Sequence, residues 1–125
     1  ALMIPHRATA GQSRFLKLGA RKYLVISIAM VAVRLEVTAG QITQAAIAVG
    51  SCSAVATRLT ALEAALINRP ADAALGAYVT EDLVAPALTP IDDIRADAAY
   101  RAHAATELIR RALLDLTDAT RGVAA

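Results

Sequence analysis

The sequence has few aromatic residues and very little cysteine or histidine. Aromatic residues make up 3% of its 125 positions, with one phenylalanine, three tyrosines and no tryptophan, so the core must be aliphatic and rich in alanine. The single cysteine, Cys52, can form neither an internal disulfide nor a metal site by itself. The histidines, His6 and His103, lack metal-ligand spacing. We therefore expect a buried, unreactive Cys52 thiol, no Cys–His catalytic pair and no metal site.

Long charged runs and long apolar runs are also missing. Lysine and arginine number 13 against 11 aspartates and glutamates, and no basic run exceeds two residues. Nucleic-acid binders usually combine a basic face with stacking aromatics, so we expect no nucleic-acid partner. The longest apolar run, residues 23–33, is shorter than the roughly 20 residues that span a bilayer, and no secretory pattern precedes it. We expect a cytoplasmic protein without a membrane partner.

Apolar residues, by contrast, are abundant. They make up 57% of a chain whose length suits a single domain, and this content argues against disorder. Residues 1–13 contain Pro5 and Gly11 and show little periodicity, which is typical of a lead-in segment. We therefore place the domain at residues 14–121.

The first half of this domain has the pattern of β-strands. Residues 23–38 predict one long strand, whose apolar first half should be covered on both faces. Ala39 and Gly40 predict a hairpin turn, and residues 41–49 predict the returning strand. Residues 14–21 are short and mixed, and Gly19 argues against a long regular element there. One further strand, without an assigned position, is left open.

The second half predicts three helices, over residues 56–68, 71–84 and 94–117. Asp92 or Asp93 should cap the third helix, because an acid is favoured at a helix N-terminus. Arg101 should lie mostly off the buried stripe of this helix. The order of elements predicts an α+β fold, in which a small antiparallel β-sheet is followed by a three-helix bundle on one face of the sheet.

The residues alone reveal no catalytic set. No glycine-rich phosphate loop is present. The paired carboxylates of Asp92 and Asp93 favour helix capping, since nothing apolar around them would raise a carboxylate pKa. Lys17 has apolar neighbours, so it either extends its ammonium group to solvent or lines a cofactor cleft.

An ordered set of four segments resembles one known family. The segments are FLKLGAR at residues 15–21, LVISIAMVAVRLE at 24–36, AAIAVGS followed by LEAAL at 45–66, and PIDDIRADAAYR at 90–101. Together they resemble the C-terminal domain of the FAD-binding (medium) subunit of molybdenum hydroxylases, the carbon monoxide dehydrogenase flavoprotein and xanthine dehydrogenase family. The resemblance covers the chain from about residue 4.

The resemblance implies a role in an oxidoreductase that this chain cannot perform alone. It implies that the domain covers the flavin and docks other subunits, with Lys17 and Arg21 near the isoalloxazine ring and Asp92, Asp93, Ile94 and Arg95 at a domain or subunit interface. The implied partners are an FAD-binding N-terminal domain, an iron–sulfur subunit and a molybdenum-cofactor subunit. FAD is expected in the complete subunit and none on this chain alone, because no segment here resembles the flavin-binding domain.

Two departures from the family pattern concern loops. Ser51 replaces the usual second glycine after the second hairpin strand, and Asp97 stands where a serine is frequent. An alternative function also follows from the missing flavin-binding part. A domain freed of that part would expose apolar surface, and it could act as a non-enzymatic module that associates with itself as a homodimer.

Overall fold

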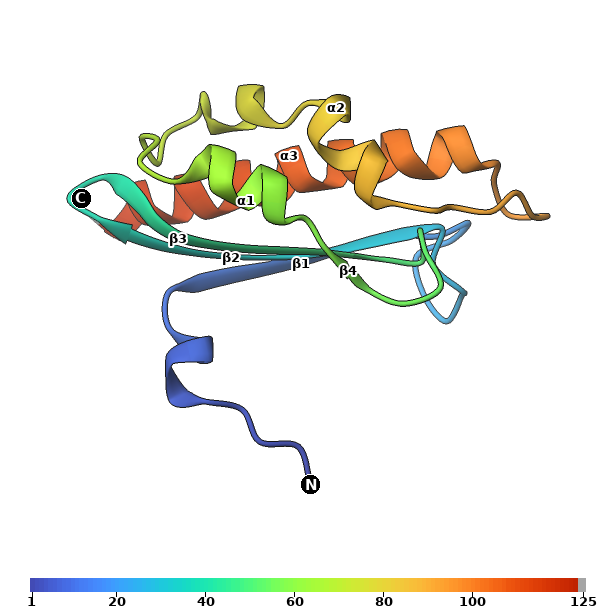
Figure 1. Cartoon of the computed structure of the whole chain (residues 1–125), viewed down its shortest axis with the longest axis horizontal. Helices are drawn as coiled ribbons and strands as arrows, with labels where there is room; N and C mark the ends of the chain where they lie inside the picture. Colours follow the sequence, from blue (N-terminus) through green and yellow to red (C-terminus); the bar gives the residue numbers. More distant parts are fainter. Residues whose placement is uncertain (124–125) are drawn as a thin grey trace.

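Four antiparallel strands form one sheet in the order β1-β2-β3-β4 (Figure 1). The computed structural model describes residues 1–123, with side chains up to residue 119. The strands are β1 (Gln12–Leu18), β2 (Ala29–Thr38), β3 (Gln41–Gly50) and the short β4 (Thr57–Arg58). The predicted hairpin is present. The further strand that was left open is β1, in the segment where no long regular element was expected.

β2 and β3 form the hairpin through the predicted Ala39–Gly40 turn. Both turn residues have positive φ, 50° and 76°, as type I′ hairpin turns require. Thr38 pairs with Gln41 directly across the turn. The turn fixes the pairing next to it, and a β-bulge then shifts the register between Glu36 and Val37. Because of this shift, Ile42 and Ile47 are both buried on the core face although they are five residues apart.

The long strand predicted over residues 23–38 is wrong in its first half. Residues 19–28 form the connection between β1 and β2, since Leu18 at the end of β1 pairs with Ala29 at the start of β2. Leu24 has a φ of 50°, and the side chain of Ile26 is exposed rather than covered. An apolar run forms a strand only where a partner strand lies alongside it. The pairing of β1 with β2 ends at Leu18 and Ala29, so residues 19–28 have no partner in β1.

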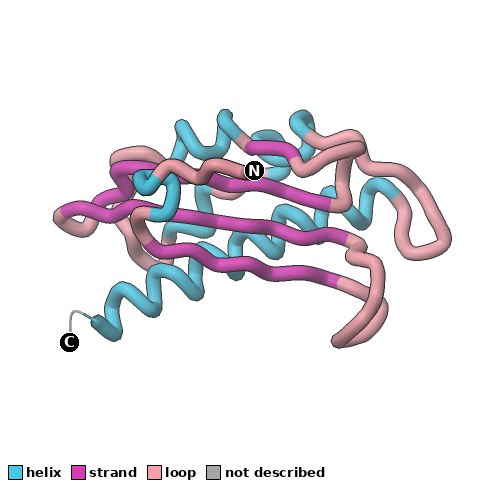
Figure 2. The backbone as a smooth tube through the Cα atoms, turned by 90° about the horizontal axis from the view of Figure 1, so that it is seen from below, coloured by secondary structure: helices cyan, strands magenta, loops and turns pink. Residues whose placement is uncertain are grey.

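Helices cover one face of the sheet, whereas the other face carries only the N-terminal segment before β1 and is otherwise open (Figures 1 and 2). The α-helices are α1 (Thr60–Leu66), α2 (Glu81–Val84) and the long α3 (Ala98–Val123). Single 3-10 turns are η1 (His6–Thr9), η2 (Leu75–Tyr78) and η3 (Ala85–Ala87). The predicted α+β class, an antiparallel sheet followed by three helices, is confirmed.

Two of the three predicted helices begin too early. The first begins at Thr60 rather than residue 56, because residues 57–58 pair with β3 as β4. The third begins at Ala98 rather than residue 94, because Asp93 and Ala96 close a tight turn through their backbone.

The helix predicted over residues 71–84 breaks into η2 and α2. Between them, Val79 has extended backbone angles, with φ −85° and ψ 95°. The carbonyl oxygen of Val79 accepts two hydrogen bonds, at 3.1 and 2.7 Å, from the guanidinium of Arg110 on α3. A tertiary contact thus replaces the helical hydrogen bond that this carbonyl would otherwise accept.

A single aliphatic core lies between the sheet and the helices. Alternate residues of β2 and β3 point into it and meet the buried faces of α1 and α3. Its fully buried large side chains include Val31, Val33, Ile47, Val49, Leu62, Leu66, Ile109 and Leu113. Aromatic side chains take no fully buried place among the described residues, which agrees with the expected aliphatic core.

Candidate functional site

Lys17 lies on the open face of the sheet. Its neighbours in β1, Leu16 and Leu18, pack against the core, so the alternation of a strand turns Phe15 and Lys17 to the other side. Phe15 is 57% exposed, and Lys17 is exposed as well. Lys17 and Phe15 therefore share the open face of β1, an edge strand of the sheet.

Arg21 lies in the loop that follows β1, close in sequence to Lys17. Both side chains are exposed, and neither pairs with a carboxylate in the described part of the chain. In the same loop, the Lys22 ammonium lies 5.4 Å from the centroid of the Tyr23 ring. This end of β1 thus offers positive charge and aromatic surface to whatever covers it.

Small side chains line the middle of the open face. A hollow of about 260 Å³ lies there between Phe15 and two arginines, Arg34 and Arg58, over a floor that includes Ala32 and Ala48. Arg34 donates a hydrogen bond to the carbonyl of Ala10 and pairs with Glu36 at 2.6 Å. The hollow combines small apolar side chains with arginines, which suits contact with a planar group or another protein layer.

The four predicted interface residues lie in the loop before α3, and they differ in their surroundings. Ile94 is 98% exposed, whereas Asp93 accepts hydrogen bonds from the Arg95 and Ala96 backbone and pairs with the Arg95 guanidinium at 2.7 Å. These N–H groups, together with nearby guanidinium charge, hold the pKa of Asp93 well below its usual range.

The sequence predicted that Asp92 or Asp93 caps α3; of these two, Asp92 bonds to a backbone N–H of the helix, and the residue directly before the helix is Asp97. The Asp92 carboxylate accepts a hydrogen bond of 2.6 Å from the Ala98 N–H. Asp97, where the family often has serine, accepts one from the Tyr100 N–H at 2.6 Å and so caps the helix. Asp93 belongs instead to an ion-pair network that the sequence analysis did not find.

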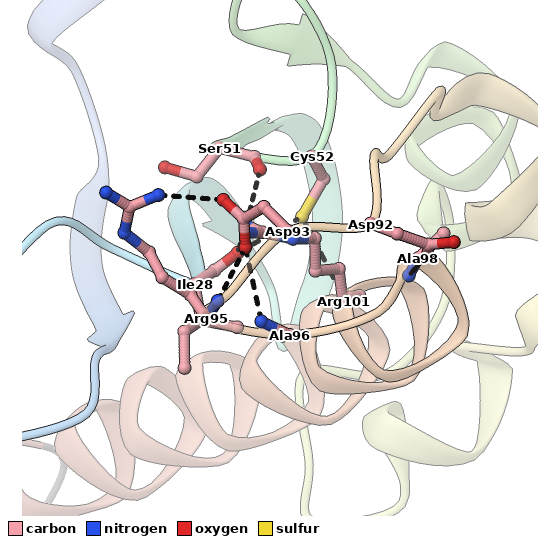
Figure 3. A network of polar contacts seen from close by, with 9 residues as sticks. All are labelled: Ile28, Ser51, Cys52, Asp92, Asp93, Arg95, Ala96, Ala98 and Arg101. Carbon is pink, nitrogen blue, oxygen red and sulfur yellow. Dashed lines mark hydrogen bonds and ion pairs between the residues drawn. The ribbon is translucent and has the colours of Figure 1, made fainter.

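Arg101 is the centre of that network, and the prediction that it lies off the buried stripe is wrong. Its side chain is 4% exposed and pairs with Asp93 at 2.7 Å (Figure 3). The same guanidinium donates to the carbonyls of Ile28 at 2.7 Å and Ser51 at 3.2 Å. One side chain therefore ties together three loops that are far apart in the sequence.

The helical spacing could have revealed Arg101. It stands four residues before Ala105, which in turn stands four before Ile109, so all three share one helix face. Arg101 continues the buried face because its guanidinium donates to carbonyls of the loops. A search for apolar residues alone does not find it, because its side chain is charged.

Cys52 lies next to this network and has the expected character. It is fully buried, and its Sγ lies 3.7 Å from the Arg101 carbonyl oxygen. Burial raises the pKa of its thiol, an effect that the Arg101 charge partly opposes. His103 contacts Glu81 at 2.9 Å. The burial and raised pKa of the Cys52 thiol favour a role in packing.

The three loops surround a hollow of about 360 Å³. Ile26 and Ser27 come from the first loop, Ser51 from the second, and Ile91 and Asp93 from the third.

Within the described residues, no group of three or more potential ligands could hold a metal ion. No helix up to residue 123 is long and apolar enough to cross a membrane.

Among known protein families, the model described as the CO dehydrogenase flavoprotein C-terminal domain matches residues 14–116 of this chain. No curated protein matches the chain.

Solved structures share the fold over most of this chain. A carbon monoxide dehydrogenase from Hydrogenophaga pseudoflava that lacks the Mo-pyranopterin moiety of its cofactor is 28% identical, with a TM-score of 0.75 over 89% of this chain and 38% of that one. The reconstituted CO dehydrogenase from Oligotropha carboxidovorans is 23% identical, with a TM-score of 0.75 over 85% and 36%. Quinoline 2-oxidoreductase from Pseudomonas putida 86 is 22% identical, with a TM-score of 0.79 over 90% and 39%. The chain thus spans less than two-fifths of these proteins' chains.

Proposed function

The chain belongs to the family of CO dehydrogenase flavoprotein C-terminal domains, as its resemblance predicted, and from this premise we propose that it covers the flavin of a molybdenum-hydroxylase-type oxidoreductase. In this proposal FAD is bound mainly by a separate N-terminal domain. The chain supplies one wall of the flavin site and a docking surface for the iron–sulfur and molybdenum-cofactor subunits. It has no catalytic set of its own.

The observation that carries this proposal is the free positive charge at the end of β1. Lys17 and Arg21 are both exposed, and no described carboxylate pairs with either of them. Phe15 adds an accessible aromatic ring on the same face as Lys17. These groups fit the ring system of a flavin, which is flat and becomes more electron-rich when it accepts electrons.

The same residues do not provide a site for the FAD pyrophosphate. Such a site usually needs a glycine-rich turn at a helix N-terminus, and no such motif occurs in this sequence. Lys17 and Arg21 would therefore approach the ring system and hold positive charge beside it. When bound, FAD would supply the electron-accepting chemistry of the complex.

The test of this role combines the chain with a co-expressed flavin-binding N-terminal domain. We expect the flavin absorbance near 450 nm to stay with the pair during purification. Lys17→Met should lower the flavin midpoint potential, because it removes positive charge that favours the reduced, anionic ring. Lys22→Met is the matched control, since it removes a neighbouring charge with no assigned flavin contact. Equal potentials in both variants would contradict the role of Lys17.

Docking of the other subunits would use the loop before α3. Asp93 and Arg95 are held in the Arg101 network, so the side chain available to a partner there is the exposed Ile94. We expect Ile94→Asp to weaken assembly with the iron–sulfur and molybdenum subunits while FAD remains bound. Assembly at wild-type strength would remove this loop from the docking surface.

A second candidate function is self-association without enzymatic activity. Several large apolar side chains are highly exposed, among them Leu2, Leu24 and Ile94. Exposed apolar patches often mark protein–protein contacts. Light scattering on the isolated chain tests this function, and a monomer at all concentrations would count against it.

A further inference from the structure

The open face of the sheet (Figure 2) carries a row of three residues near the end of β1. Lys17 of β1 pairs with Met30 of β2, and Met30 pairs with Gly50 of β3. The neighbours of Met30 in β2, Ala29 and Val31, are buried in the core. Because side chains alternate along a strand, Met30 therefore lies on the open face, between a lysine and a glycine.

The side chain of Met30 lies flat against the sheet because Gly50 has no side chain. A Cβ on Gly50 would lie 2.6 Å from the Cε of Met30, 2.9 Å from its Cγ and 3.4 Å from its Sδ. The methionine thus extends across the glycine, whereas most strand side chains stand away from the sheet. Gly50 has no positive φ, so the feature that requires a glycine here is the space that Met30 takes.

The next row of the open face has small side chains at its centre. Phe15 of β1 pairs with Ala32 of β2, which pairs with Ala48 of β3. The two rows lie about 7 Å apart along the strands and extend about 10 Å from β1 to β3. We call these two rows the platform; its residues are Phe15, Lys17, Met30, Ala32, Ala48 and Gly50.

The platform is apolar with one positive charge at its border. Lys17 is its only charged residue, and none of its residues is acidic. The segment before β1 contacts the open face further along β2, where Arg34 donates a hydrogen bond to the carbonyl of Ala10, and this contact lies outside the platform. A flat apolar surface with a cation at its border fits a planar ring system that gains negative charge.

We propose that the isoalloxazine ring of FAD stacks on the platform in contact with the Met30 thioether, and that Gly50 is a positioning residue that keeps Met30 flat. This inference rests on the proposed flavin role and adds contacts on β2 and β3 to it. A thioether is polarisable and makes favourable contacts with aromatic rings. Two strand spacings give the platform enough width for three fused rings.

The first test compares how fast hydrogen peroxide oxidises the two methionines of the chain, Met3 and Met30. The chain is bound to the co-expressed N-terminal domain, with FAD or after its removal, and mass spectrometry follows each sulfoxide. We expect FAD to slow the oxidation of Met30 by about fivefold or more, because the ring covers the thioether. Met3 is 93% exposed and lies outside the platform, so its rate is the internal control.

The second test changes the shape of the platform. Gly50→Ala should weaken binding of the FAD-loaded N-terminal domain by about tenfold, because the new Cβ pushes Met30 out toward the ring. Met30→Ala should weaken the same binding by about threefold, since the thioether contact is lost. The double variant should bind about as well as Met30→Ala alone, because the new Cβ then meets no methionine.

The matched control for the glycine variant is Gly76→Ala. A Cβ there meets only Arg110, at the ordinary distance of 3.8 Å, and it lies outside the platform, so binding should be unchanged. Circular dichroism checks that each variant is folded. Met30→Ala only shortens a half-buried side chain on the open face, so it tests the contact even if Gly50→Ala unfolds the chain.

Three results would overturn the proposal. One is a Met30 that oxidises at the same rate with and without FAD, which would show that the ring does not cover it. Another is unchanged binding in both single variants. The third is a double variant as weak as Gly50→Ala, which would separate the role of Gly50 from the position of Met30.

Failure of this inference is distinguishable from failure of the flavin role. FAD that does not stay with the wild-type pair, or equal potentials in Lys17→Met and Lys22→Met, would contradict the flavin role itself. FAD that stays bound and responds to Lys17→Met, together with an unprotected Met30, would contradict the platform alone.

Discussion

Arg101 carries a full charge in a side chain that is almost completely buried. Three oxygen atoms satisfy its terminal nitrogens, one from each of the three loops around the 360 Å³ hollow, while its Nε has no hydrogen-bond partner among the described atoms. Removing a charged donor of this kind leaves carbonyl groups without partners in a place that water reaches poorly. The residue is therefore the point at which the loops are most sensitive to mutation.

We predict that Arg101→Met lowers the free energy of unfolding by about 3 kcal/mol, because hydrogen bonds from a charged group are lost and their acceptors stay buried. Urea denaturation of the two proteins measures the difference. Arg101→Lys is the matched control, since it keeps the charge and part of the hydrogen bonding and should lose less. A methionine variant as stable as the wild type would show that the network does not support the loops.

Asp93 makes stability depend on pH in a defined direction. Its pKa in the folded chain lies well below the ordinary value of about 4 that it has when unfolded. Its contribution is therefore fully present above the unfolded pKa and is lost as the pH falls through the folded pKa. We predict that the stability advantage of wild type over Asp93→Asn shrinks steadily as the pH falls below about 4. Unfolding curves over a pH series measure this, and an advantage that grows toward low pH would contradict it.

At the scale of elements, the hairpin turn contains one residue, Ala39, that is poorly suited to the backbone angles it adopts. Ala39 adopts a left-handed conformation with φ 50°, although its Cβ makes that conformation costly. The following Gly40 adopts φ 76°, and a Cβ there would meet nothing within 4 Å, so its glycine serves the backbone angle alone. The hairpin therefore forms in spite of strain at one residue, because ten-residue strands pair on either side of it.

We predict that Ala39→Asn raises the free energy of unfolding by about 0.5–1 kcal/mol, since asparagine tolerates the left-handed region and Asn-Gly is favoured in such turns. Thermal and urea unfolding measure the gain. Ala39→Val is the control and should destabilise the chain, because a β-branched side chain resists positive φ. If both variants lose stability equally, the turn has a different conformation in solution.

At the scale of the whole molecule, one core joins the sheet to the helices, and α3 crosses the full length of the sheet (Figure 1). Adjacent leucines on α3 lie in opposite environments, since Leu113 is fully buried and Leu114 is 45% exposed. This contrast follows from the 100° turn between successive helical residues, and it defines which face of α3 belongs to the core.

We predict that Leu113→Ala costs about 2–5 kcal/mol of unfolding free energy, because it leaves a cavity in the core. Leu114→Ala should change the same quantity by less than about 0.5 kcal/mol. Urea denaturation of the pair is a direct measurement, and similar losses from both would mean that the helix is rotated from the position described.

The sequence by itself determined the class of the fold, the hairpin and its turn, and its resemblance to known segments indicated the family. The fold class and the hairpin follow from local signals: alternation in residues 33–37, the Ala39-Gly40 pair, and helical spacing before and after the loops. Periodicity and turn chemistry act between near neighbours, so they can be read without knowing what packs against them. The placement of Lys17 and Arg21 near a flavin, and of Asp92, Asp93, Ile94 and Arg95 at an interface, came from the family resemblance and stays a prediction.

Only the tertiary structure decided which apolar residues are buried and where the long elements end. Residues 23–28 are predicted as strand, yet they form a loop with exposed Leu24 and Ile26, because β1 stops pairing at Leu18. Residues 71–84 are predicted as one helix. In the structure this helix is interrupted at Val79, whose carbonyl accepts hydrogen bonds from the Arg110 guanidinium. Arg101 is predicted as a surface residue, yet it is buried. Its guanidinium donates hydrogen bonds to two loop carbonyls that lie 50 and 73 residues away in the sequence. Each difference arises from a partner distant in the sequence, which no local pattern can supply.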